Sequence, residues 1–135
     1  MIDVNPFVSD FIKQGILKTL EIINAFKKID RADFVLSEFK EQAYVNKPLP
    51  IGEGQTISQP YTVAFMIELL QPKVGDKIFE IGFGSGWQTA LLAEIVGAKG
   101  QIFAVERISE LYRFGRKNVA KYNFIKHGIV KTIGG

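Results

Sequence analysis

Cysteine is absent from the sequence, and histidine occurs once among its 135 residues. Without cysteine the chain can form neither a disulfide bond nor a thiolate metal site, and this composition is compatible with a reducing, intracellular compartment. The single histidine, His127, has no imidazole partner for a metal, and its neighbour Gly128 indicates a solvated loop. We therefore expect no metal centre.

Long apolar segments are absent too. No run of the sequence approaches the length of a membrane span, and the first residues lack the basic and apolar regions of a secretory signal. We therefore expect a cytoplasmic protein that does not contact membranes.

Positive and negative charges nearly balance over the chain as a whole, so the formal net charge is only +3. The last third is more basic: after Glu106 the only acid is Glu110, and the cations are Arg107, Arg113, Arg116, Lys117, Lys121, Lys126 and Lys131. This pattern is typical of the solvated side of an amphipathic helix. Nucleic-acid binding is the less favoured alternative, since no aromatic or Arg-rich recognition motif accompanies the charges.

No internal repeat, low-complexity tract or linker divides the chain, and its length and apolar content suit a single domain, 1–135. Within it we expect an N-terminal helical cover (1–46), a substrate and cofactor loop followed by a helix (47–76), and the first half of a nucleoside-binding sheet (77–135). Asn5 and Pro6 predict the first helix start, with Asn5 as N-cap. A later helix is predicted from about Pro60 to Leu70.

A glycine loop between a strand and a helix is the strongest pattern in the sequence. Residues 77–81 have strand character, Gly82, Gly84 and Gly86 follow at every second position, and 88–96 is compatible with a helix. Glycines let the backbone adopt positive φ and lie close against a ligand. The helix beyond directs its unpaired N–H groups and its positive dipole end towards that ligand.

A carboxylate follows at the end of the next apolar run, 101–105. Glu106 stands twenty residues after Gly86, where a βαβ unit places an acid that accepts hydrogen bonds from a ribose diol. The dinucleotide fingerprint needs a small residue where this chain has Trp87. The glycine spacing instead resembles the first motif of class I methyltransferases, which bind S-adenosylmethionine. An ordinary glycine-rich turn with a chance acid is the alternative.

Two more elements complete the predicted sheet. A helix opens at Ser109 and contains Gly115; because glycine inside a helix costs roughly 1 kcal/mol relative to alanine, we expect Gly115 to pack closely on a neighbour. Residues 129–133 predict a third strand. The expected fold is therefore α/β and Rossmann-like, with about three parallel strands and helices, preceded by the helical cover.

Residues 48–60, Pro-Leu-Pro-Ile-Gly-Glu-Gly-Gln-Thr-Ile-Ser-Gln-Pro, closely resemble the signature of the protein-L-isoaspartate O-methyltransferases. Residues 29–35, 80–88 and 105–108 are also similar to that family's pattern, so the resemblance extends over essentially the whole chain. The family methylates the free carboxylate of isoaspartyl residues in damaged proteins, which initiates protein repair. The resemblance implies this activity, S-adenosyl-L-methionine as cofactor, and isoaspartyl-containing peptides or proteins as substrates.

The resemblance also implies which residues form the site. Ser58, in the place of the family's active-site serine, and Thr56 would be the catalytic residues at the substrate carboxylate. The residues implied for cofactor binding are Gln55, Thr56, Ile57, Ser58, Glu80, Gly82, Gly84, Gly86 and Glu106. Since a carboxylate is already ionised at neutral pH, methyl transfer requires positioning rather than a general base. Ser58 could also be a plain helix cap, and the two roles are compatible.

The sequence departs from its family in extent. Class I methyltransferases usually have seven strands, whereas this chain has room for three, and Gly134-Gly135 stands where the family has a Gly-Asp-Gly turn whose acid contacts adenine. The glycine-loop strand has apolar residues that suit burial on both faces, Ile78, Phe79 and Ile81, yet it would lie at an open sheet edge. We expect a C-terminal half, a partner chain or a second copy to cover that edge.

Two other functions stay open at this point. One is a truncated, non-enzymatic remnant that binds nucleoside or self-associates. The other is a methyltransferase for RNA or another small acid, which only the basic C-terminal third favours.

Overall fold

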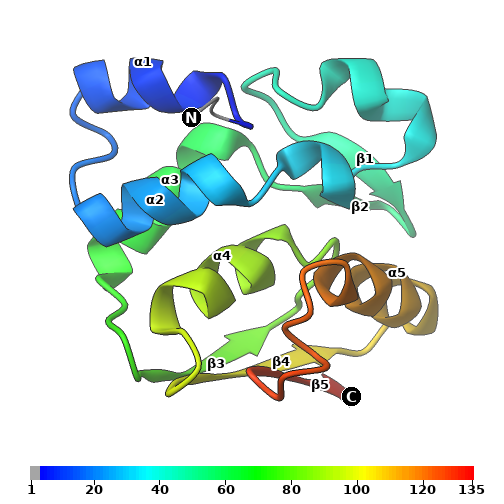
Figure 1. The fold of residues 1–135 in the computed structure, drawn as a ribbon. Coiled ribbons are helices and arrows are strands. Elements are labelled where there is room, and N and C mark those ends of the chain that lie inside the picture. The colour runs from blue at the N-terminus through cyan, green and yellow to red at the C-terminus, as the bar shows by residue number, and fades with distance from the viewer. Residues whose placement is uncertain (1–3) are drawn as a thin grey trace.

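The computed structural model describes residues 4–135, which form a helical layer above a short parallel sheet (Figure 1). The first part consists of helices α1 (Phe7–Lys13) and α2 (Leu20–Lys28) and the 3₁₀ helices η1 (Arg31–Phe34) and η2 (Ser37–Gln42). A small antiparallel hairpin follows, made of β1 (Leu49–Gly52) and β2 (Gln55–Ile57). The remaining elements are α3 (Pro60–Leu70), β3 (Lys77–Ile81), α4 (Trp87–Val96), β4 (Gln101–Glu106), α5 (Ser109–Ala120) and β5 (Val130–Gly134).

The sheet has the strand order β3-β4-β5, with both pairs parallel. Its register aligns Ile78 with Ile102 and Val130, and Ile81 with Val105 and Ile133. The Rossmann-like βαβαβ arrangement predicted from the sequence is therefore confirmed, and the boundaries predicted for its strands and helices agree to within a residue or two. The segment before α3, for which the sequence predicts a loop, instead forms the hairpin of β1 and β2. Because β3 carries the glycine loop and stands first in the order, the loop lies at the edge of the sheet.

Helix α4 forms the centre of the core. Eight of its ten residues are buried, because the helix lies between α2 and the sheet. Trp87, at its first position, packs edge-on against the rings of Phe7 and Phe26, with centroid distances of 6.2 and 5.7 Å. The N-terminal helices are thus joined to the start of α4, directly behind the glycine loop.

Asn5 plays a different part from the one predicted. The N-cap of α1 is Pro6, and Asn5 is buried with its side-chain amide donating to the carbonyls of Phe26 and Ile29 at 2.6 and 2.7 Å. Its Oδ1 atom accepts the backbone N–H of Arg31 at 3.0 Å. The prediction of an N-cap was wrong because the buried carbonyls at the end of α2 need a donor, which Asn5 supplies.

One face of the sheet is left bare. Helices α4 and α5 lie on the same side of it, and no element among residues 4–135 covers the other side (Figure 1). Alternate residues of β3 point to that bare side, so Phe79 is 62% exposed and Ile81 80%. The apolar pattern of β3 is typical of a strand covered on both faces, and in the described part of the chain it is covered on one.

No helix in the described part of the chain is long and apolar enough to cross a membrane.

Candidate functional site

The glycine loop has the backbone conformation that its sequence predicts. Gly82, Gly84 and Gly86 have φ values of +78°, +49° and +87°, which residues with a Cβ rarely adopt. The backbone N–H groups of Gly82 and Phe83 both donate to the carbonyl of Val105, at 2.7 and 3.1 Å. These bonds hold the loop against the end of β4, where the predicted ribose acid stands.

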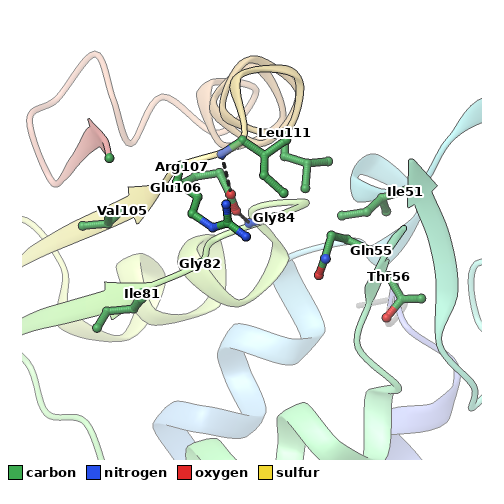
Figure 2. A pocket seen from close by; sticks show the side chains of 12 residues that line it. Ile51, Gln55, Thr56, Ile81, Gly82, Gly84, Val105, Glu106, Arg107 and Leu111 are labelled. Atoms are coloured by element: carbon green, nitrogen blue, oxygen red, sulfur yellow. Dashed lines mark hydrogen bonds between the residues drawn. The ribbon is translucent and has the colours of Figure 1, made fainter. Parts of the chain in front are cut away.

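Glu106 is buried and held by two backbone donors. Its carboxylate accepts the N–H of Gly84 and the N–H of Ile108, each at 3.0 Å (Figure 2). An ionised carboxylate offers about four lone-pair sites, so about two remain for a diol after these bonds. The contacts also fix the carboxylate between the glycine loop and the turn into α5, at the place where the sequence predicts a sugar.

A cavity of about 240 Å³ opens beside Glu106 (Figure 2). On one side lie the glycine loop and the strand ends, and on the other the hairpin residues Ile51, Gln55 and Thr56. Ile108 and Leu111 of the α5 region complete an apolar wall. A polar group at one end and apolar side chains around it are typical of a site for a nucleoside, whose base is flat and largely apolar.

A second, smaller cavity of about 130 Å³ lies on the other side of the glycine loop. Ser58 and Glu80 both line it, together with Gln88. Three residues, Thr56, Gly82 and Gly84, line both cavities. The two spaces therefore flank the same stretch of loop, and the hairpin forms the facing wall of each.

Glu80 is an acid almost without solvent contact. Its Oε1 accepts the Thr89 hydroxyl at 2.5 Å and its Oε2 accepts the Gln88 amide at 3.3 Å. Burial raises the pKa of Glu80 to about 7, while both hydrogen bonds act in the opposite direction. Near neutral pH this carboxyl is consequently divided between its neutral and charged forms, and a cationic group in the adjacent cavity would favour the charged one.

Ser58 is exposed and does not cap a helix. The N-cap of α3 is Gln59, and no side chain forms a cap hydrogen bond there. The Ser58 carbonyl accepts a hydrogen bond from the Arg31 guanidinium at 3.0 Å. The plain capping role is therefore not the reason for a serine at this position.

The structure brings nearly all the site residues named from the sequence around these two cavities. Gln55, Thr56, Ile57, Ser58, Glu80, Gly82, Gly84 and Glu106 each line at least one of them. Gly86 does not, because it lies behind the loop, where an added Cβ would be 2.8 Å from the Gly115 carbonyl oxygen. Close packing against α5 and a φ of +87° both account for glycine at this position.

Sequence reasoning missed several lining residues. Arg107, Ile108 and Leu111 follow Glu106 directly, so their place in the chain was a usable signal. Ile51 and Gln88 lie inside the segments that resemble the family, 48–60 and 80–88, but the place of the first depends on how the hairpin folds over the loop and that of the second on the Glu80 contact. Within residues 4–135 no group of three or more metal-binding side chains is found.

A protein-family model described as Protein-L-isoaspartate(D-aspartate) O-methyltransferase (PCMT) matches residues 3–134. The chain belongs to this family. A protein-L-isoaspartate O-methyltransferase from Aeropyrum pernix is 41% identical over 128 residues, covering 95% of the chain and 48% of the relative. One from Thermococcus onnurineus is 46% identical over 112 residues, covering 83% and 50%. The chain thus spans about half the length of the curated relatives it matches.

Solved structures of the family have the same fold. A putative protein-L-isoaspartate O-methyltransferase from Plasmodium falciparum, in complex with S-adenosyl-L-homocysteine, matches the whole chain with a TM-score of 0.86 at 23% identity, over 64% of its own length. A second protein-L-isoaspartate O-methyltransferase matches 96% of the chain with a TM-score of 0.82 at 26% identity, over 41% of its length. The fold is therefore an incomplete class I methyltransferase fold, as the sequence predicts.

Proposed function

We propose that this chain binds S-adenosyl-L-methionine and takes part in methyl transfer to the carboxylate of L-isoaspartyl residues in damaged proteins. The observation that carries the proposal is the pair of cavities that share Thr56, Gly82 and Gly84. Glu106, the acid predicted to bind the ribose, lines one cavity, and Ser58 lines the other. A ligand lying across the shared loop would reach from one to the other, and a family member with this fold is bound to S-adenosyl-L-homocysteine.

The residues present fit such a cofactor. Glu106 retains free lone pairs for a ribose diol, and an added Cβ at Gly84 would meet only Ile51, so the loop leaves the adjoining space open. Glu80 provides a carboxyl beside Gly82 for the ammonium of the amino-acid part. When bound, the cofactor supplies an electrophilic methyl group on a sulfonium, which carries its own leaving group.

The chain's own contribution to the reaction is positioning. An isoaspartyl carboxylate is ionised at neutral pH, so its oxygen can act as the nucleophile without a general base. Ser58 and Thr56 place hydroxyl groups on the hairpin side of the smaller cavity, where one carboxylate oxygen can accept a hydrogen bond while the other stays free to react. Holding two reacting groups in this way contributes through proximity and orientation.

Calorimetry with S-adenosyl-L-homocysteine tests the binding part of the proposal. A methyl-transfer assay then compares an isoaspartyl peptide with the same peptide containing normal aspartate. Binding with transfer to the first peptide alone supports the proposal, whereas no binding contradicts it. Binding without transfer would favour the non-enzymatic remnant, and salt-sensitive RNA binding with transfer to RNA would favour the third alternative.

We propose further that another polypeptide surface covers the edge of the sheet at β3, because exposed apolar side chains recur throughout residues 61–81, which lead into and include this strand. They lie on the outer side of α3, in the loop that follows it and on the bare face of β3: Tyr61, Phe65, Met66, Leu69, Leu70, Val74, Phe79 and Ile81. A patch of this kind is typical of an interaction surface, and an open strand edge invites pairing. The covering surface is a complementing segment that corresponds to the unmatched half of the relatives, or a second copy.

Light scattering coupled to size-exclusion chromatography tests this second proposal. For the wild-type chain we expect self-association, and Ile81→Lys should reduce it without loss of secondary structure because it places a charge on the bare face. Ile12→Lys makes the same change at an exposed isoleucine of α1, outside the patch, and should leave association unchanged. A wild-type chain that remains a stable, soluble monomer with its β3 face exposed would contradict the proposal.

The cytoplasmic location expected from the sequence stays a prediction.

A further inference from the structure

Arg31 is a fully buried cation at the first position of η1. Its guanidinium forms no ion pair within residues 4–135. It donates instead to four backbone carbonyls: Nη1 to Ala43 at 2.8 Å and Val45 at 3.4 Å, and Nη2 to Lys47 at 2.9 Å and Ser58 at 3.0 Å. Burial lowers the pKa of Arg31 to about 10, so the group stays charged at neutral pH.

Burying a charge without an opposite charge is costly, and hydrogen bonds to carbonyl dipoles compensate only part of the cost. Each bond from a charged donor is nevertheless stronger than one between neutral groups. The planar fork of a guanidinium can direct such bonds to several acceptors at once, which the single ammonium of lysine cannot reproduce. The arrangement thus depends on arginine in particular. The positions of the four carbonyl acceptors show which segments the Arg31 guanidinium fixes.

Two of the four acceptors lie at the two ends of the hairpin. Lys47 stands just before β1, and Ser58 follows directly after β2. The hairpin between them consists of strands of four and three residues, and an isolated two-stranded hairpin is at best marginally stable. By bonding to both carbonyls, Arg31 closes the base of the hairpin. It thereby holds Gln55 and Thr56 of β2 and the adjoining Ser58, which line the cavities.

The same guanidinium contacts the cofactor side of the site. Its central carbon lies 5.4 Å from the centroid of the Trp87 ring, in a cation–π arrangement. Trp87 is the first residue of α4, directly after Gly86, and its backbone N–H is bonded to the Ser85 hydroxyl at 3.2 Å. A single buried side chain therefore touches both the base of the hairpin and the end of the glycine loop.

We propose that Arg31 is a positioning residue, which sets Ser58 and Thr56 against the glycine loop by closing the base of the hairpin. This inference rests on the proposed function for its catalytic consequence, and its structural part can be tested separately. Arg31 does not contact either cavity. It acts through the backbone of Ser58 and through Trp87.

Hydrogen exchange of the wild-type chain gives the first test and needs no variant. The amides of residues 49–57 should be protected nearly as well as those of β3 and β4, although the hairpin is short, because Arg31 ties its ends to the core. Fast local exchange of the hairpin in the wild-type protein would overturn the proposal.

Arg31→Lys gives the second test, because it retains the positive charge and removes the fork. We expect hairpin amides to exchange at least about tenfold faster, since most of the charge-assisted bonds are lost, while exchange in β4 and α5 changes little. Lys121→Met is the matched control: Lys121 donates to the Asp33 carbonyl in the same 3₁₀ helix at 2.7 Å and does not reach the hairpin. Equal acceleration over the whole chain would make Arg31 a general stability residue and overturn the proposal.

Ligand measurements separate this inference from the proposed function. Arg31→Lys should weaken binding of S-adenosyl-L-homocysteine only moderately, because Gln55 and Thr56 of the loosened hairpin line the larger cavity while Glu106 keeps its own contacts with the glycine loop. It should lower kcat for an isoaspartyl peptide by a larger factor, about tenfold or more, because Ser58 and Thr56 lose their position. If Arg31→Lys kept the wild-type kcat, the positive charge alone would be sufficient, which would contradict the proposal. A wild-type chain that binds no cofactor defeats the proposed function, while the exchange result still decides the role of Arg31.

Discussion

Gly86 of the glycine loop and Gly115 of α5 lie face to face, so that the loop and the helix approach more closely than side chains would allow. A Cβ on Gly86 would be 2.7 Å from the Val119 side chain and 2.8 Å from the Gly115 carbonyl oxygen. A Cβ on Gly115 would press on the Gly84 carbonyl and on the Phe83 ring. Asn118, one turn further along α5, donates to the Ser85 carbonyl at 3.0 Å and fixes the same contact.

Gly115→Ala separates packing from helix propensity. By propensity alone, alanine in mid-helix should stabilise the chain by roughly 1 kcal/mol. We expect the opposite, a loss of about 1–3 kcal/mol, because overpacking displaces the loop. Denaturant unfolding monitored by circular dichroism measures the change. Lys117→Ala, at an exposed position of the same helix, should stay within about 0.5 kcal/mol of wild type, and a stabilised Gly115→Ala variant would refute the packing account.

Glu80 predicts a dependence of stability on pH. The folded chain retains the proton of this carboxyl up to a pKa of about 7, whereas the unfolded chain loses it near 4.5. Between these values the native state binds more protons than the unfolded state, so the free energy of unfolding falls as the pH rises. The loss is on the order of 3.5 kcal/mol when complete, because the pKa differs by about 2.5 between the two states and one pKa unit corresponds to about 1.4 kcal/mol.

Glu80→Gln removes this titration and serves as the comparison. The variant should unfold with nearly wild-type free energy at pH 5 and be the more stable of the two at pH 8, since an amide keeps an acceptor for Thr89 without a buried charge. Unfolding in urea at both pH values measures the difference. Parallel pH curves for the two proteins would show that Glu80 is not the group responsible.

The glycine-loop half of the site could be predicted from the sequence because its geometry is local. The positive φ values of Gly82, Gly84 and Gly86 follow from residue type and spacing, and the place of Glu106 follows from the βαβ connection. The close packing predicted for Gly115 was confirmed for the same reason: a glycine in mid-helix has a cost that something must offset. The division of the chain into three parts stays a prediction.

The rest depends on contacts between segments far apart in the chain. Asn5 accepts the backbone N–H of Arg31, 26 residues away, and Arg31 donates to Ser58, 27 residues further on. Periodicity and spacing contain no signal for such contacts. A buried arginine in a chain of ordinary composition looks like any surface arginine until its acceptors are known. The exposed side of α3 was equally hidden, because an apolar helix predicts burial and no element among residues 4–135 covers that side.

Gly84 and Gly97 offer a matched pair for testing the ligand site. Both need positive φ, +49° and +69°, and an added Cβ would meet nothing closer than 3.4 Å at either position. Gly97 combines its positive φ with a ψ of −167°, a region that is essentially restricted to glycine, so Gly97→Ala should cost at least as much stability as Gly84→Ala. Only Gly84 lines the cavities. We expect the bulkier Gly84→Val to abolish binding of S-adenosyl-L-homocysteine in calorimetry, and Gly84→Ala to weaken it at least about tenfold, whereas Gly97→Ala binds normally. Unaltered binding by Gly84→Val would place the ligand elsewhere.

Ser58→Ala tests whether the hydroxyl acts on the substrate rather than on the fold. Because Ser58 does not cap α3, its removal should change the free energy of unfolding by less than about 0.5 kcal/mol. If the hydroxyl holds one oxygen of the isoaspartyl carboxylate, kcat should fall about tenfold or more while the affinity for S-adenosyl-L-homocysteine changes little. Ser37→Ala is the control, since Ser37 is also exposed, opens a helical segment and lies away from both cavities. Equal losses of turnover and of cofactor affinity in Ser58→Ala would make Ser58 part of the cofactor site alone.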